Sequence, residues 1–261
     1  MRYLRLYLYF LRFSFSKAMA FRLDFTFRIV MDCFFYAVNL GFYKVLFLSQ
    51  PSIAGWREDQ VMVFVGSYLL IDALHMTVFS SNMWWLPFTI NRGDLDNYLT
   101  RPVSTLFFVS LREFSANSFV NLLIATGIFA TALWRLTTPF GALELACYLL
   151  LLLNGWLLNY VLQMLFIIPT FWTQSNRGFN EFYFSMSVAH ERPDRIYRGV
   201  LRWLLTVILP FALIASFPAR LFFEEFDPHL LLHLAGVSAL LWVGMIWFWR
   251  KGLRAYSSAS S

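Results

Sequence analysis

The sequence predicts an all-α membrane protein that crosses the bilayer six times and keeps both termini in the cytoplasm. Hydrophobic residues make up 59% of the 261 residues and charged residues only 14%, whereas an ordinary soluble domain is about 25% charged. The apolar runs continue for about twenty residues, the length that a membrane-spanning helix needs. A β-barrel would instead show shorter segments of alternating polarity. The basic residues concentrate in the loops of one side, which sets the orientation.

The N-terminal segment, residues 1–24, places arginines among aromatic residues too often to form a span. We interpret it as an amphipathic helix that lies along the cytoplasmic membrane surface. A transmembrane domain, residues 25–249, follows, and a Ser-rich cytoplasmic tail, residues 250–261, ends the chain. The six predicted spans are approximately 25–48, 61–85, 105–133, 142–170, 200–217 and 229–249.

Basic residues decide which side of the membrane each loop occupies. Most of the 21 Lys and Arg residues fall on the side of the termini, and the positive-inside rule assigns that side to the cytoplasm. The polar stretches 87–104 and 172–202 would then also be cytoplasmic. On the other side, residues 218–228 mix Phe and Leu with acidic residues, which favours a short interfacial or re-entrant helix.

The loop at 87–104 is polar and separates two nearly uncharged spans. Asn91, Gly93 and Asp94 are typical of a turn or a helix start, and the Asp94 side chain can cap a helix N-terminus. Arg101 precedes a proline, so a helix would stop there. The pattern predicts a short rigid helix across the membrane face that transmits force between two spans; an ordinary capped turn is the alternative.

Several polar residues and prolines lie within the predicted spans. Asp72 and His75 share one helix face, where they could relay protons, satisfy each other or line a polar cavity. Amide side chains need partners in lipid, so they either join helices or line a substrate path. Prolines in the fifth span would form a gate or a kink. The amides are Asn117, Asn121, Asn154, Asn159 and Gln163, and the prolines are Pro210 and Pro218.

The sequence offers little support for an enzyme. It contains no GxxxxGK[ST] phosphate loop and no GxSxG motif, so this chain would not bind ATP through such a loop. Cys33 and Cys147 lie in apolar runs without metal-ligand spacing. An intramembrane lipid-modifying enzyme that uses the acidic residues near position 225 is a minor alternative. The net charge of +6 is explained by topology, so no nucleic-acid partner is expected.

The chain resembles the six-span membrane subunits of type 2 ABC exporters, the branch described as ABC-2 family transporter protein. The resemblance extends over essentially the whole chain. It is most specific in the run Ile90-Asn91-Arg92-Gly93-Asp94-Leu95-Asp96, continued by Leu99, Arg101 and Pro102. It also includes the basic, aromatic N-terminal segment, and Arg192-Pro193 with Tyr197 before a Pro-bearing span.

The resemblance implies that residues 1–24 are a connecting helix and that residues 91–101 are a coupling helix that docks on a separate cytoplasmic ABC ATPase. That ATPase would bind Mg-ATP, and this chain would carry no cofactor. A docking face of Leu95, Tyr98 and Leu99 would insert into the partner. The residues assigned to ATPase coupling are Asn91, Arg92, Gly93, Asp94, Leu95, Asp96, Tyr98, Leu99 and Arg101.

The resemblance further implies a complex of two permeases, identical or related, and two ATPases in a bacterial inner membrane. The substrate would pass between the permeases, along spans 1, 2 and 5, in contact with membrane lipid. The aromatic-rich spans themselves suit an amphipathic or lipid-like substrate, although aromatic side chains also fill helix interfaces. Two other functions remain open. One is a proton-coupled secondary transporter or channel that uses Asp72 and His75, and the other is a structural or assembly subunit.

Overall fold

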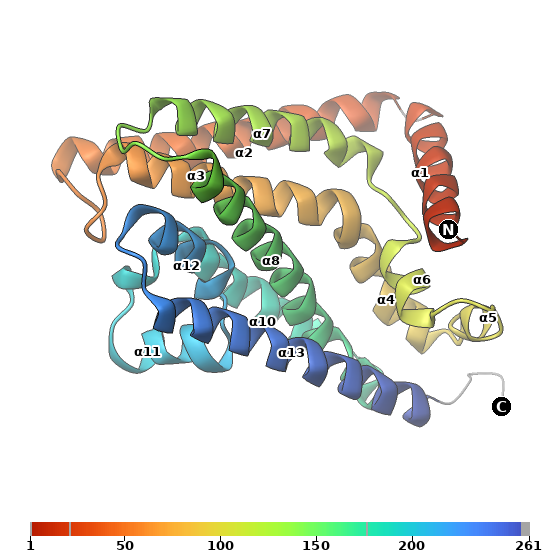
Figure 1. Cartoon of the computed structure of the whole chain (residues 1–261). Helices are drawn as coiled ribbons and strands as arrows, with labels where there is room; N and C mark the ends of the chain where they lie inside the picture. Colours follow the sequence, from red (N-terminus) through yellow and green to blue (C-terminus); the bar gives the residue numbers. More distant parts are fainter. Residues whose placement is uncertain (1, 21, 176, 257–261) are drawn as a thin grey trace.

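A computed structural model describes residues 2–20, 22–175 and 177–256, which are almost entirely helical (Figure 1). Five helices of these residues are long and apolar enough to cross a membrane: Ile29–Ser49, Glu58–Asn91, Ala116–Arg135, Ala142–Thr173 and Pro228–Ala255. The predicted all-α, polytopic fold is therefore confirmed.

The elements follow one another without a long unstructured connection in the described residues. They are α1 Arg2–Ala20, α2 Arg22–Ser49, α3 Glu58–His75, η1 Met76–Ser80, α4 Ser81–Asn91, α5 Asp96–Leu99, α6 Thr105–Leu111, α7 Ala116–Arg135, α8 Ala142–Ile167, α9 Thr170–Thr173, α10 Arg177–Ser187, η2 Val188–Glu191, η3 Asp194–Ile196, α11 Gly199–Trp203, η4 Leu204–Ile208, α12 Ala212–Phe223 and α13 Pro228–Ala255.

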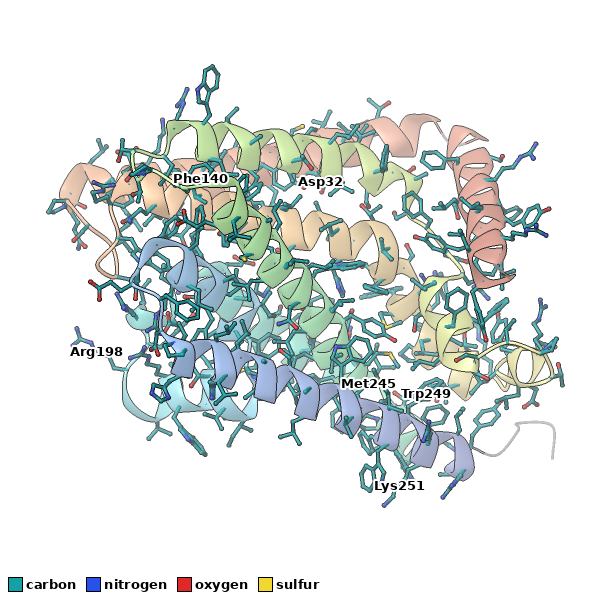
Figure 2. The ribbon with its side chains drawn as sticks, viewed as in Figure 1. Asp32, Phe140, Arg198, Met245, Trp249 and Lys251 are labelled. Carbon is teal, nitrogen blue, oxygen red and sulfur yellow. The ribbon has the colours of Figure 1, made fainter. Side chains whose placement is uncertain are left out.

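The bundle has two ends, which we call the α5 end and the Trp56 end. The α5 end carries α1, α5, α6 and the last turns of α13, so the first and last described residues lie at the same end (Figure 1). The Trp56 end carries the connections 50–57, 136–141 and 224–227. Figure 2 shows Phe140 and Arg198 at the Trp56 end, with Trp249 and Lys251 near the opposite one.

α3 lies in the centre of the bundle and contacts α2, α7, α8 and α12. Its buried residues lie on every face, and Phe64, Tyr68 and Leu69 are fully buried, as expected for a helix that packs on every side. The π-turn η1 joins α3 to α4, so the predicted span 61–85 is part of one longer candidate span from Glu58 to Asn91. Pro87 lies inside α4 rather than at the start of the polar loop.

The third predicted span is divided into α6 and α7 by a break near Glu113. Asn82 pairs with both backbone groups of Glu113 at this break. Its Nδ2 donates to the Glu113 carbonyl at 2.7 Å, and its Oδ1 accepts from the Glu113 amide at 2.8 Å. The Ser115 amide donates to the Thr77 carbonyl at 2.8 Å. These bonds pair backbone groups that a buried break would otherwise leave unsatisfied.

The stretch 172–202 is not a cytoplasmic loop, because it leads from one end of the bundle to the other. At the α5 end, Asn91 donates to the carbonyl of Gln174 at 3.0 Å. At the Trp56 end, Arg195 lies 2.5 Å from Glu224, which in turn accepts from the Trp56 indole at 3.1 Å. The helices α10 and η2 cover the distance between these two points and thus form an additional crossing.

This crossing escapes a search for apolar runs because it is short and amphipathic. α10 and η2 extend from Arg177 to Glu191, about 22 Å at helical rise, and apolar neighbours shield their buried face. Tyr183 of α10 is 4% exposed and donates to Asn159 of α8 at 2.8 Å. Packing against α8 therefore accounts for the buried Tyr183, whereas Arg177 and Glu181 of α10 are exposed and pair with each other at 3.3 Å.

The predicted fifth span, 200–217, is part of a hairpin whose two ends both lie at the Trp56 end. We call residues 196–223 the hairpin. It consists of α11 with η4 and of α12, and the two arms are bent by 96°. Because Arg195 and Glu224 bond to each other at 2.5 Å, both ends of the hairpin lie at one end of the bundle, and the segment does not cross it.

The sequence predicts a re-entrant element at 218–228, whereas in the structure the hairpin at 196–223 has this form. Pro218 does not begin a new element but lies inside α12, whereas Pro210 lies at the bend between the arms. The arm α12 packs closely on α8: a Cβ added to Gly155 would lie 2.0 Å from the carbonyl oxygen of Ile214. At the C-terminus, α13 continues as far as Ala255, and residues 257–261 of the predicted tail lie outside the described residues.

Candidate coupling surface and intramembrane polar residues

The loop between α4 and α6 forms the exposed tip of the α5 end. α4 ends at Asn91, and the chain then turns through Gly93, whose φ is +80°, a conformation that glycine adopts without steric cost. α5 is a single turn, Asp96–Leu99. The Asp94 side chain does not cap it, so the prediction of an Asp94 cap was wrong, although a short helix does form.

The apolar residues of this loop point in different directions. Leu95 is fully buried, and the ring of Tyr98 stacks on Phe108 of α6 at a centroid distance of 4.9 Å. Leu99 is 41% exposed. The predicted docking face of Leu95, Tyr98 and Leu99 is therefore wrong for its first two members, which attach the loop to the bundle.

The groups available to a partner are mostly polar. Gly93 and Asp96 are half-buried, and the exposed loop residues are Asn91, Arg92, Asp94, Asn97, Leu99, Thr100 and Arg101. Beside them lies a cavity of about 450 Å³ that is lined by Phe88, Arg92 and Asn97, among others. Arg92 and Asp94 form no ion pair among the described residues, so their charges remain available to a second protein.

Several contacts hold this loop rigidly against the spans. Arg101 donates from Nε to the Asn97 carbonyl at 3.1 Å, and its guanidinium lies 5.0 Å from the centre of the Phe108 ring. Arg112 donates to the Tyr98 hydroxyl and bonds to Glu113 at 3.0 Å. Movement of the loop would therefore be passed directly to α6 and, through Asn82, to α4.

Asp72 and His75 do not bond to each other. Asp72 Oδ1 lies 3.0 Å from Nε2 of His190 in η2, and His75 Nε2 lies 2.7 Å from Oε1 of Gln163 in α8. The prediction of a mutually satisfied pair was wrong, because α3 is surrounded by helices and each side chain finds a closer partner on a different one. Asp72 thus connects α3 to the short crossing, and His75 connects α3 to α8.

Most of the predicted amides join helices. Asn121 donates to Asp32 of α2, Asn154 donates to Ser238 of α13 at 3.0 Å, and Asn159 accepts from Tyr183. The Oδ1 atom of Asn117 is buried and has no hydrogen-bond partner among the described residues. These partners are what a packing role requires; whether any of the amides also lines a substrate path stays a prediction.

A sequence model of the family described as ABC-2 family transporter protein matches residues 33–260. The chain belongs to this family. No curated protein and no solved structure matches the chain. Members of the family are typically non-catalytic membrane subunits that work with an ATPase partner. Within the described part of this transporter chain, no group of three or more His, Cys, Asp or Glu side chains is arranged to hold a metal ion.

One polar cluster of the transporter chain was missed by the sequence reasoning. Asp194 is fully buried beside the hairpin, and its Oδ2 accepts from Arg202 at 2.9 Å and from Arg220 at 3.3 Å. Its Oδ1 accepts from the hydroxyl of Ser216 at 2.7 Å. Arg202 lies on α11, and Ser216 and Arg220 lie on α12, so one carboxylate joins both arms of the hairpin.

The signal for this cluster was present in the dense charges of 190–202. A charge count predicts a cytoplasmic loop here, because it cannot detect that an arginine such as Arg202 pairs with Asp194 inside the fold. The prolines predicted as gate or kink residues take different places around the cluster. Pro210 lies at the bend of the hairpin, and Pro218 lies on α12 between Ser216 and Arg220.

Proposed function

We propose that this chain is the permease subunit of an ATP-driven exporter, with the α5 end in the cytoplasm and a separate subunit hydrolysing ATP. The observation that supports this proposal most directly is the rigid, exposed loop at residues 91–101. It presents unpaired charges beside a cavity of about 450 Å³, while Leu95 is fully buried and Tyr98 stacks on Phe108 of α6. This is what a surface that receives force from another protein requires.

The distribution of basic residues supports the same orientation. Arg192, Arg195, Arg198 and Arg202 lie at the Trp56 end. The excess of basic residues at the α5 end is therefore smaller than the sequence predicts. It keeps its direction, because α1, the 91–112 region and the last turns of α13 are rich in basic residues. The α5 end is therefore the side that the positive-inside rule assigns to the cytoplasm, in a bacterial inner membrane.

The complex would contain two permeases, identical or related, and two ATPases that bind Mg-ATP. The substrate path would lie between the permeases, bordered by α2, α3 and the short crossing of α10 and η2. Asp72 and His190 join the last two of these elements at 3.0 Å. Exposed aromatic side chains such as Phe34 and Phe42 of α2 suit an amphipathic or lipid-like substrate.

The test is co-purification of the chain with a phosphate-loop ATPase in equal copies. The double variant Leu99→Asp with Arg101→Glu changes two exposed loop residues, and we expect it to lose the ATPase while the permease keeps its helicity. Arg254→Glu is the matched control, because Arg254 is an exposed arginine at the same end of the bundle but outside the loop. Equal ATPase recovery with both proteins would contradict the proposal.

A proton-coupled carrier is the second candidate, and the intramembrane Asp72–His190 pair is the observation that favours it. The two functions separate in reconstituted vesicles. The exporter requires the ATPase and ATP for transport. Transport by this chain alone, driven only by a pH gradient, would favour the carrier and rule out the leading proposal.

A further inference from the structure

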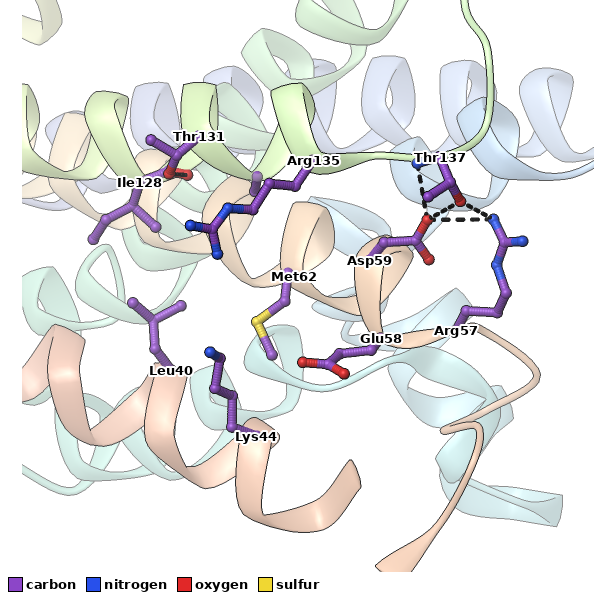
Figure 3. Close-up of a pocket in the computed structure, with 11 residues that line it drawn as sticks. Leu40, Lys44, Arg57, Glu58, Asp59, Met62, Ile128, Thr131, Arg135 and Thr137 are labelled. Atoms are coloured by element: carbon purple, nitrogen blue, oxygen red, sulfur yellow. Dashed lines mark hydrogen bonds and ion pairs between the residues drawn. The ribbon is translucent and has the colours of Figure 1, made fainter. Parts of the chain in front are cut away.

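A second cavity lies at the Trp56 end, far from the loop at residues 91–101. Its volume is about 600 Å³, and residues of α2, α3 and α7 line it (Figure 3). Three cationic and two acidic side chains contribute to the lining, together with apolar side chains. The cavity therefore combines charge with an apolar wall at one end of the membrane-crossing bundle.

Part of this charge is already paired. Arg57 bonds to Asp59 at 3.3 Å, and Arg57 Nη2 donates to the Thr137 hydroxyl at 2.8 Å. The Thr137 amide donates to Asp59 at 3.0 Å. These bonds, drawn with dashed lines in Figure 3, tie the start of α3 to the connection after α7 at one side of the cavity.

The other three charged residues have no such partners. Lys44 of α2, Glu58 of α3 and Arg135 of α7 form no hydrogen bond or ion pair through their side chains among the described residues. All three are exposed. Figure 3 shows the ammonium group of Lys44 and the guanidinium of Arg135 extending into the same space, with the Glu58 carboxylate at its side. The cavity thus offers two unpaired cations and one unpaired carboxylate.

Charged and apolar side chains line the cavity at different depths along the three helices. On α2, Leu40 lies one turn deeper than Lys44, about 6 Å nearer the middle of the bundle. On α3, Met62 lies one turn deeper than Glu58, and on α7, Ile128 lies two turns deeper than Arg135. All three helices therefore place charge at the Trp56 end and apolar side chains below it, the arrangement in which a lipid presents its headgroup and acyl chains.

We propose that this cavity binds one phospholipid whose headgroup carries both a phosphate and a primary ammonium. Lys44 and Arg135 donate charge-assisted hydrogen bonds to the phosphate, and Glu58 accepts from the ammonium, which has three N–H donors. The acyl chains lie against Leu40, Met62 and Ile128. A quaternary ammonium has no N–H to donate, and a glycerol headgroup leaves Glu58 facing an uncompensated anion.

The test uses native mass spectrometry of the purified chain with added phosphatidylethanolamine, phosphatidylcholine or phosphatidylglycerol of the same acyl chains. We expect the wild type to prefer phosphatidylethanolamine, and Lys44→Gln with Arg135→Gln to weaken its binding about tenfold. Glu58→Gln should remove the preference over phosphatidylcholine, and Glu58→Lys should turn it toward phosphatidylglycerol. Lys251→Gln and Glu225→Gln, exposed residues elsewhere on the chain, are the matched controls and should change nothing.

Equal binding of the three lipids by the wild type would overturn the proposal, and so would an unchanged preference in the Glu58 variants. Soluble phosphoethanolamine provides the arm that separates a lipid from a free phosphate ester. If it competes as strongly as the lipid on a molar basis, the site recognises a soluble headgroup compound and the lipid assignment is wrong. Circular dichroism of each variant establishes that the helices are retained.

Discussion

Arg195 Nη2 lies 2.5 Å from Glu224 Oε2, although 29 positions separate the two residues in the chain. This contact joins the two ends of the hairpin at the Trp56 end. It excludes a crossing by residues 196–223 and gives that role to α10 and η2. The topology of the second half of the chain therefore depends on this relationship.

Impermeant thiol labelling tests this topology directly. In a chain with Cys33→Ser and Cys147→Ser, we expect Ser175→Cys and Arg198→Cys to be labelled from opposite sides of the membrane, because α10 and η2 separate them. The charge count alone would place both residues in the cytoplasm. Labelling of both from the same side of sealed vesicles would contradict the crossing.

The buried carboxylate of Asp194 is expected to be essential for a stable hairpin. Asp194→Ala leaves the Arg220 guanidinium, whose side chain is 14% exposed, without this partner. Loss of one member of a buried ion pair costs about 3–5 kcal/mol. Arg220 keeps a weaker contact to Glu224 at 3.6 Å, so we expect the lower part of that range. Thermal unfolding in detergent measures the loss, and Glu225→Gln, at an exposed carboxylate, should change stability by no more than about 0.5 kcal/mol.

Gly155 sets the distance between α8 and α12. A Cβ at this position would lie 2.0 Å from the Ile214 carbonyl oxygen, so Gly155→Ala must push the backbone of α12 away. We expect a loss of about 1–3 kcal/mol, measured by thermal unfolding. Gly244→Ala on α13 is the control, because nothing lies within 4 Å of its added Cβ, and the helix should gain up to about 1 kcal/mol. A similar response of both variants would argue against close packing at Gly155.

A double-mutant cycle can identify the partner of Asp72. Asp72→Asn and His190→Gln should be coupled by about 0.5–3 kcal/mol, because the two side chains bond at 3.0 Å. Asp72→Asn and His75→Gln should be nearly additive, since His75 bonds to Gln163 instead. Unfolding free energies of the single and double variants provide the measurement, and strong coupling to His75 with none to His190 would contradict the geometry.

The two leucines of the loop at residues 91–101 should behave differently. Leu95→Ala removes a fully buried side chain and should cost about 2–5 kcal/mol of stability. Leu99→Ala alters an exposed side chain and should leave stability almost unchanged, while weakening binding of the ATPase. Thermal unfolding and co-purification separate the two effects, and equal destabilisation by both variants would show that Leu99 is also part of the core.

The amino-acid sequence by itself determined the membrane class, the five long spans except for the start of the third, and the position of the exposed loop at 91–101. These features follow from local composition: a bilayer requires about twenty apolar residues in succession, and a polar interruption such as Asn91-Arg92-Gly93 must leave it. The exposed Leu99 and Arg101 were assigned correctly to the surface of that loop. No pattern in the loop distinguishes buried Leu95 from exposed Leu99, because tertiary packing decides which of the two is buried.

Only the tertiary structure decided the fifth crossing, the hairpin and the partners of the buried charges. A charged or amphipathic segment can enter the membrane region when neighbouring helices satisfy its polar groups, as Asn159 does for Tyr183 and Asp194 does for Arg220. Those partners lie on elements remote in the chain, so neither hydropathy nor charge counting detects them. Local composition thus specifies which segments can face lipid. Long-range pairing specifies which polar residues can be buried between the helices.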